Sequence, residues 1–192
     1  MSEINENLEI IYHLLVDNPD EFESDLKTLI LNPEKIKDTN RFASLLSKLN
    51  MSDLINPLLI QISKANNHDT WLTDFMYAAI NLLTEASVDD EFDVPESLVE
   101  KLKIWILEFD GELAWKAASL LKFHPSEAAS EIQLKKLEQR GDFFLTYVEC
   151  ITGLLWYDKE KHLSLINDIG QDETRGKKLQ EYIHNYLNNN SQ

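Results

Sequence analysis

An acidic segment near the middle of the chain contains residue types that could form a functional site. This segment, "SVDDEFDVPES" (residues 87–97), has five carboxylates, no basic residue and one aromatic residue, Phe92. It lies within residues 65–100, which hold nine acidic residues and no lysine or arginine. Carboxylates at this density could bind a divalent cation, perform acid–base catalysis, form a solvated turn before a helix, or face a basic protein.

Metal-binding and catalytic motifs have spacings that this sequence lacks. The acidic segment has no glycine at its sixth position and no alternating ligands, so it does not match a calcium-binding EF-hand loop. The five histidines have no metal-binding spacing and are scattered: His13, His68, His124, His162 and His184. Cys150, the only cysteine, lies on an apolar helical stripe, which predicts a buried and unreactive thiol. Because nucleotide-binding and nucleophile motifs are also missing, we expect no catalytic residue, no metal, no cofactor and no enzymatic activity.

The net charge of −16, from 34 acidic and 18 basic residues, narrows the classes of partner. Such a charge repels nucleic acid and anionic membranes, and it attracts basic proteins. Two basic clusters run against this trend, one at residues 135–140 and one at residues 175–178. Their members are Lys135, Lys136, Arg140, Arg175, Lys177 and Lys178. We interpret both clusters as ordinary solvated helix faces.

The sequence predicts a cytoplasmic protein. Its first residues lack the basic and apolar regions of a signal peptide. No apolar run approaches the roughly 18 residues of a membrane span. The single cysteine excludes an internal disulfide and suits a reducing compartment. We therefore expect a cytoplasmic monomer that binds neither membrane nor nucleic acid.

Apolar residues recur at the helical period along most of the chain, and no segment alternates in the manner of a β-strand. All five prolines can stand at the start of a helix. Gly111, Gly141 and Gly170 follow apolar runs, where a left-handed residue often ends a helix. The pattern predicts an all-α fold of ten or eleven helices with no β-sheet. The expected helices are 3–17, 19–31, 38–49, 53–65, 70–86, 96–109, 112–123, 126–140, 143–157, 159–169 and 173–188.

Three segments align without gaps and indicate an internal repeat of helix hairpins. They are "FMYAAINLL" (75–83), "LAWKAASLL" (113–121) and "YVECITGLL" (147–155). Each ends on a leucine that we expect to be buried, and each has a small or polar residue where a neighbouring helix could approach closely. The leucines are Leu83, Leu121 and Leu155, and the small or polar residues are Asn81, Ser119 and Gly153.

These hairpins resemble HEAT-like repeats, and an irregular helical bundle is the alternative. The resemblance implies antiparallel helix hairpins stacked as a short right-handed superhelix. We expect one domain over residues 1–192: N-terminal helices in 1–66, HEAT-like hairpins in 67–170, a last helix in 171–188 and a frayed tail in 189–192.

The acidic composition and the helical repeat together resemble the immunity proteins of bacterial contact-dependent growth inhibition and polymorphic toxin systems. The residues that carry this resemblance are the acidic runs at 3–25 and 69–96 and the repeat itself. It implies an antitoxin whose acidic surface blocks the active-site cleft of a basic nuclease toxin. A helical-repeat scaffold or adaptor is the second hypothesis, and an enzyme with a dispersed site is a weaker third.

The longest turn between repeat helices is the acidic segment, which makes it the expected binding surface. The alternative is a plain solvated turn whose acids favour the dipole of the following helix. Trp71, beside two acids at a helix start, is a further candidate anchor, since tryptophan is frequent at interface hot spots. The expected partner-binding residues are Asp69, Trp71, Asp74, Asp89, Asp90, Glu91, Phe92, Asp93 and Glu96.

Overall fold

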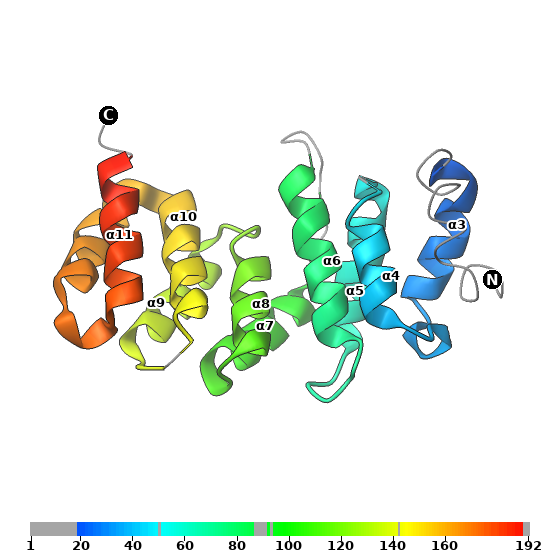
Figure 1. The fold of residues 1–192 in the computed structure, drawn as a ribbon, viewed down its shortest axis with the longest axis horizontal. Coiled ribbons are helices and arrows are strands. Elements are labelled where there is room, and N and C mark those ends of the chain that lie inside the picture. The colour runs from blue at the N-terminus through cyan, green and yellow to red at the C-terminus, as the bar shows by residue number, and fades with distance from the viewer. Residues whose placement is uncertain (1–18, 50, 87–91, 93, 142, 190–192) are drawn as a thin grey trace. The chain divides into compact units, whose positions relative to one another are not determined.

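The computed structural model describes residues 19–49, 51–86, 92, 94–141 and 143–189. These residues contain α-helices, short 3₁₀ turns and connecting segments, and no β-strand lies among them. The α-helices are α3 (Pro19–Ile30), α4 (Thr39–Leu46), α5 (Ile55–Lys64), α6 (Leu72–Glu85), α7 (Glu96–Glu108), α8 (Glu112–Leu121), α9 (Glu127–Glu138), α10 (Phe144–Gln171) and α11 (Lys177–Asn189). The 3₁₀ turns are η1 (Pro33–Lys35), η2 (Ser52–Leu54) and η3 (Glu173–Arg175). The all-α prediction is therefore confirmed for this part of the chain (Figure 1).

The expected helices agree with the observed ones in order and, within a few residues, in extent. The expected helix 3–17 lies outside the described residues. The two helices expected at 143–157 and 159–169 are the two halves of α10, which bends at Asp158. There the backbone leaves the helical region (φ −156°, ψ 90°), and the Asp158 carboxylate accepts a hydrogen bond from the backbone N–H of Lys161 at 3.0 Å. Asp158 thus caps the second half in the way an N-cap residue does.

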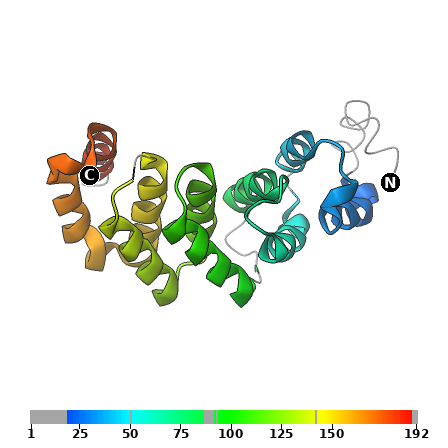
Figure 2. The same cartoon turned by 90° about the horizontal axis from the view of Figure 1, so that it is seen from below.

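The chain divides into two compact units, and the boundary lies between Lys101 and Leu102, inside α7. In the N-terminal unit, α6 packs against α4 and α5, and Figure 2 shows these helices nearly end-on. The rings of Phe42 on α4 and Phe75 on α6 are both buried, with centroids 6.3 Å apart. Burial of these aromatic and aliphatic side chains is the main force that holds the unit together.

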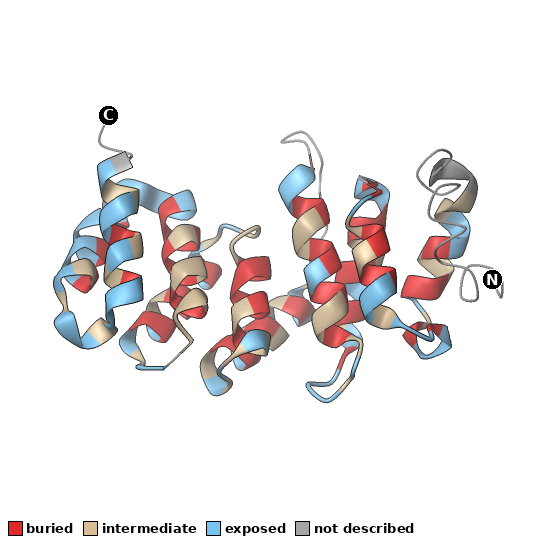
Figure 3. Ribbon diagram, viewed as in Figure 1, coloured by how far each residue is buried: buried red, intermediate tan, exposed pale blue. Residues whose placement is uncertain are grey.

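In the C-terminal unit, α10 is the central helix and packs against α8, α9 and α11 (Figure 1). The sides of these helices that face their neighbours carry the buried residues, as Figure 3 shows. The three repeat segments fall on α6, α8 and α10, and their final leucines, Leu83, Leu121 and Leu155, are buried as expected.

None of the three glycines ends a helix in the way that was expected. Gly111 does adopt a left-handed backbone (φ 77°), at the residue that precedes α8. Gly141 has no positive φ, and Gly170 lies inside α10. A Cβ at Gly170 would be 2.8 Å from Cγ2 of Ile183 on α11. The absence of a side chain at Gly170 therefore lets two helices approach closely, and it does not end a helix.

Candidate functional site

Most of the predicted acidic turn lies outside the described residues. This applies to Asp89, Asp90, Glu91 and Asp93. Phe92 is described and half-buried. Glu96 is exposed in the first turn of α7, where a carboxylate favours the helix dipole.

The other predicted acids lie around the start of α6, and both form hydrogen bonds within the N-terminal unit. Asp74 accepts from the hydroxyl of Thr39 at 2.6 Å and from the amide of Asn40 at 3.2 Å. Both donors belong to the first turn of α4, so Asp74 links the starts of two helices. Asp69 accepts from the backbone N–H of Asn66 at 2.7 Å and stabilises the turn before α6. These carboxylates already have a structural role, which leaves their binding role a prediction.

Trp71 immediately precedes α6 and is half-buried. Its ring lies against that of Phe75, with centroids 5.1 Å apart. Asp38, which the sequence reasoning did not select, caps α4 by accepting from the backbone N–H of Arg41 at 3.0 Å. Because Asp74 binds the adjacent Thr39, the two carboxylates of Asp38 and Asp74 stand at the same helix start. We call Asp38, Asp69, Trp71 and Asp74 the acidic edge.

Charge is distributed unequally between the two units. Residues 1–101 contain 20 acidic and 7 basic residues, a net charge of −13. Residues 102–192 contain 14 acidic and 11 basic residues, a net charge of −3. Most of the negative charge of the chain therefore lies in the N-terminal unit.

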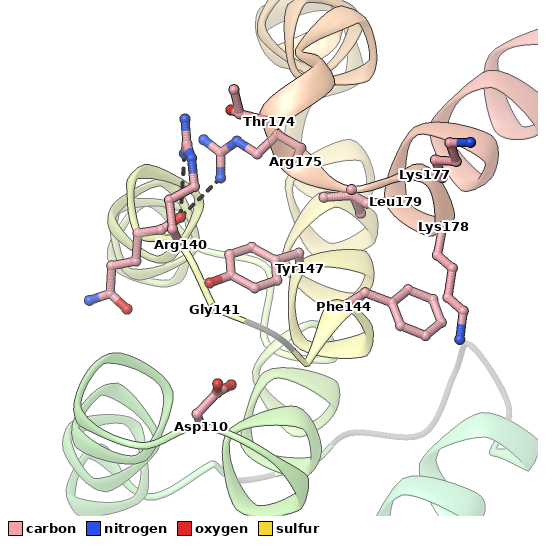
Figure 4. Close-up of a pocket in the computed structure, with 12 residues that line it drawn as sticks. Asp110, Arg140, Gly141, Phe144, Tyr147, Thr174, Arg175, Lys177, Lys178 and Leu179 are labelled. Atoms are coloured by element: carbon pink, nitrogen blue, oxygen red, sulfur yellow. Dashed lines mark hydrogen bonds between the residues drawn. The ribbon is translucent and has the colours of Figure 1, made fainter.

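The C-terminal unit has a cleft of about 660 Å³ with a basic lining (Figure 4). Arg140 comes from the loop between α9 and α10, Arg175 from η3, and Lys177 and Lys178 from the first turn of α11. We call this the basic cleft. Its cations belong to the two clusters that were expected to be ordinary solvated helix faces. Arg140, Lys177 and Lys178 are exposed as expected, whereas Arg175 is half-buried.

Asp172 holds the two arginines in place. Its Oδ2 accepts from Nη2 of Arg140 at 3.2 Å and lies 3.6 Å from Nε of Arg175. Its Oδ1 accepts from the backbone N–H of Thr174 at 3.0 Å and from the Thr174 hydroxyl at 2.6 Å. The hydrogen bonds from Thr174, followed by the two guanidinium charges, lower the pKa of Asp172. One carboxylate thus fixes both η3 and the arginines of the cleft.

Lys136 is also not the solvated side chain that was expected. It is 3% exposed, and its Nζ donates to the Phe109 carbonyl at 3.3 Å and to Oε1 of Gln139 at 3.1 Å. The ammonium lies 5.7 Å from the centre of the Tyr147 ring, within the range of a cation–π interaction. The carbonyl of Gln139 in turn accepts from Nη1 of Arg175 at 3.0 Å. Lys136 therefore stabilises Gln139 and Tyr147, two residues that line the cleft.

Tyr147 forms part of the same wall. The residue is 3% exposed, and its hydroxyl has no hydrogen-bond partner among the described residues. Burial, followed by the negative charge of Asp110, raises the pKa of this hydroxyl, so it remains a protonated donor. Figure 4 shows it between Arg140 and Asp110, beside Gly141. A Cβ at Gly141 would stand 2.8 Å from the hydroxyl and 3.2 Å from Oδ2 of Asp110.

Side chains that could bind a metal or act as a nucleophile do not cluster among the described residues. In that part of the chain, no group of three or more histidine, cysteine, aspartate or glutamate side chains could hold a metal ion. Cys150 is fully buried, and burial raises its pKa to about 12, as expected for an unreactive thiol. None of the described helices has both the length and the apolar composition needed to span a lipid bilayer.

Similarity to known proteins gives no further information about the site. No family model matches this sequence, and no curated protein or solved structure is significantly similar to it.

Proposed function

We propose that this chain is a non-enzymatic immunity protein that captures and neutralises a basic nuclease toxin in the cytoplasm. The observation that carries the proposal is the concentration of negative charge in the N-terminal unit, −13 of the total −16. A nuclease binds phosphates through a basic cleft, and a carboxylate surface can occupy that cleft in place of the substrate. In this proposal the helix hairpins stack in the HEAT-like manner, and carboxylates of the N-terminal unit form the surface that blocks the toxin's cleft.

Two physical effects support this role. A strong negative field steers a basic protein to the surface and raises the association rate, most of all at low ionic strength. A half-buried aromatic side chain such as Trp71 or Phe92 offers apolar contact area that slows dissociation. Charge and aromatic residues therefore serve different stages of binding, and mutations can separate them.

The direct test pairs the purified protein with a nuclease toxin domain encoded beside its gene. Cleavage of a labelled RNA by that domain is measured while the concentration of this protein is increased. We expect cleavage to stop near an equimolar ratio. Binding without inhibition would overturn the immunity role and favour the scaffold hypothesis, and an absence of binding would overturn both.

The first prediction concerns the acidic turn. Reversal of two charges, in the Asp89→Lys, Asp90→Lys double variant, should lower the association rate constant about tenfold and flatten its dependence on salt. Stopped-flow fluorescence at two salt concentrations measures both effects. The matched control is the Glu131→Lys, Glu160→Lys double variant, which makes the same charge change at two exposed positions of the C-terminal unit. Equal slowing in both double variants would mean that only total charge matters, and that the turn is not the contact surface.

Truncation of the aromatic residue tests the anchoring role in the same assay. The Phe92→Ala variant should speed dissociation and weaken binding by about 1–3 kcal/mol, while association stays nearly unchanged. Thermal denaturation of the free variant is the control. A large loss of stability would show that Phe92 belongs to the core and has no anchoring role.

A further inference from the structure

We propose that the basic cleft of the C-terminal unit is a binding site for a small phosphate monoester, of the size of a nucleoside monophosphate. The proposal is independent of the immunity role. It rests on four cations, on a buried donor without an acceptor, and on a helix start, all of which line a single cleft.

The cations are arranged before any ligand binds. Asp172 and the Gln139 carbonyl hold the guanidinium groups of Arg140 and Arg175 in fixed positions. Side chains that are already ordered lose less conformational entropy when they bind an anion. Lys177 is exposed, lines the cleft, and has no ionic partner among the described residues. Its ammonium is therefore available to a ligand.

Buried donors in the wall lack acceptors. The Tyr147 hydroxyl and Nε of Arg175 are buried and form no hydrogen bond within the described residues. For Arg175, the nearest carboxylate oxygen stands at 3.6 Å, too far for a hydrogen bond. Leaving a buried donor unsatisfied is costly, and such donors normally have a partner. Ligand oxygens in the cleft could supply an acceptor to the Tyr147 hydroxyl.

The start of α11 adds backbone donors to the same place. Gly176 has a positive φ of 82°, and the first intrahelical bond runs from the N–H of Gln180 to the Gly176 carbonyl. The backbone N–H groups of residues 177–179 precede this bond, so they have no hydrogen-bond partner four residues earlier in the helix. A helix N-terminus with free N–H groups favours a phosphate group, because the dipole and the donors act together.

The remaining lining limits the ligand to a compact molecule. Oδ2 of Asp110 lies near the Tyr147 hydroxyl, since a Cβ at Gly141 would be 3.2 Å from the first and 2.8 Å from the second. This side of the cleft therefore repels phosphate, and the Asp110 carboxylate can accept from a ligand hydroxyl or amino group. Phe144 adds an aromatic surface, with the ammonium of Lys178 5.4 Å from its ring centre. A long polyanion such as RNA would need further phosphate contacts, which the net charge of −3 on this unit opposes.

The experiment measures binding by isothermal titration calorimetry at constant ionic strength, with adenosine monophosphate, inorganic phosphate and adenosine as probes. We expect the two phosphates to bind and adenosine not to bind. The Lys177→Gln variant should bind adenosine monophosphate about tenfold more weakly, since it loses one charge-assisted contact. The Tyr147→Phe variant should bind several-fold more weakly while it keeps the ring that packs beneath Lys136.

The control is Lys135→Gln, which removes an equal charge from an exposed position on α9 outside the cleft. It should bind the phosphates as the unmodified protein does. Thermal denaturation of each variant verifies that it is folded. A failure of both phosphates to bind would overturn the proposal. Equal weakening by Lys135→Gln would also overturn it, because attraction would then be nonspecific. Tighter binding of an acidic peptide than of adenosine monophosphate would assign the cleft to a protein segment and overturn it as well.

Discussion

His162 is a buried titratable side chain at the start of the second half of α10. It is 3% exposed, and its Nε2 lies 3.3 Å from the hydroxyl of Ser130 on α9. Burial lowers the pKa of its imidazole, the positive charge of Lys161 lowers it further, and the negative charge of Asp158 opposes both. The neutral ring is therefore favoured in the folded state.

This residue should make the stability of the protein depend on pH. In the unfolded chain the imidazole takes up a proton near its ordinary pKa of 6.5, whereas the folded chain takes it up only at lower pH. The unfolded state binds more protons between these two values, so stability should fall as the pH drops below about 6.5. Melting temperatures measured between about pH 8 and pH 5 should show this decline in the wild-type protein and a weaker one in His162→Gln. The exposed His184 provides the control: His184→Gln should keep the wild-type profile, and equal slopes in all three proteins would contradict the assignment.

The close contact between α9 and α10 depends on a glycine, Gly153, which has no side chain. A Cβ at Gly153 of α10 would lie 2.0 Å from Nε2 of Gln133 on α9, and Gln133 is only 1% exposed. The gap-free alignment of the three repeats predicted a small or polar residue at this position to allow close approach. The residue that occupies the space could not be predicted, because Gln133 lies 20 residues earlier in the chain, on a different helix.

The Gly153→Ala substitution should therefore overpack this contact. Because the Gln133 amide cannot move out into solvent without disturbing the core, we expect a loss of about 1–3 kcal/mol in the free energy of unfolding. Urea denaturation measures it, and Ser164→Ala on the exposed side of the same helix should change stability by less than about 0.5 kcal/mol. In the Gly153→Ala, Gln133→Ala double variant part of the loss should disappear. Strict additivity of the two substitutions would show that the two side chains do not collide.

Helix positions were predictable from the sequence because each depends on residues close together in the chain. The apolar period sets the buried side, and capping residues such as Asp38 and Asp158 fix the starts. Gly170 shows the limit of this reasoning. It follows an apolar run, as a helix-ending glycine would, but its role depends on Ile183 of another helix.

The basic cleft could not be predicted for a related reason. Arg140 and Arg175 are 35 residues apart, and only folding brings both to Asp172. The sequence contained one signal, namely two basic clusters in an otherwise acidic chain. That signal does not reveal that Lys136 turns inward or that Tyr147 is left without a partner.

At the scale of the whole molecule, net charge opposes folding. A charge of −16 on 192 residues repels itself in the compact state, and most of it lies in residues 1–101. Described ion pairs such as Lys122–Glu149 at 2.7 Å and Arg140–Asp172 at 3.2 Å offset only a small part of this repulsion, and both lie in the C-terminal unit.

Salt should therefore stabilise this protein. Raising sodium chloride from about 0.02 M to about 0.5 M shortens the screening length several-fold and weakens the repulsion between carboxylates. We expect the melting temperature to rise over this range, and to rise less in a variant in which Asp53 and Glu85, two exposed acids of the N-terminal unit, are both replaced by lysine. A melting temperature that falls with salt would show that attractive ion pairs outweigh the net repulsion.

The buried thiol of Cys150 has a use that follows from its place in the fold. It is the only cysteine in the chain, it lies on the central helix of the C-terminal unit, and it is inaccessible in the folded state. A thiol-specific reagent can react with it only after the helices around α10 separate. The rate of labelling therefore reports how often that unit opens locally, in the way that the rate of amide exchange does for backbone groups. If a molecule bound in the basic cleft holds α10 and α11 together, the labelling rate of Cys150 should fall, and no engineered label is needed to measure it.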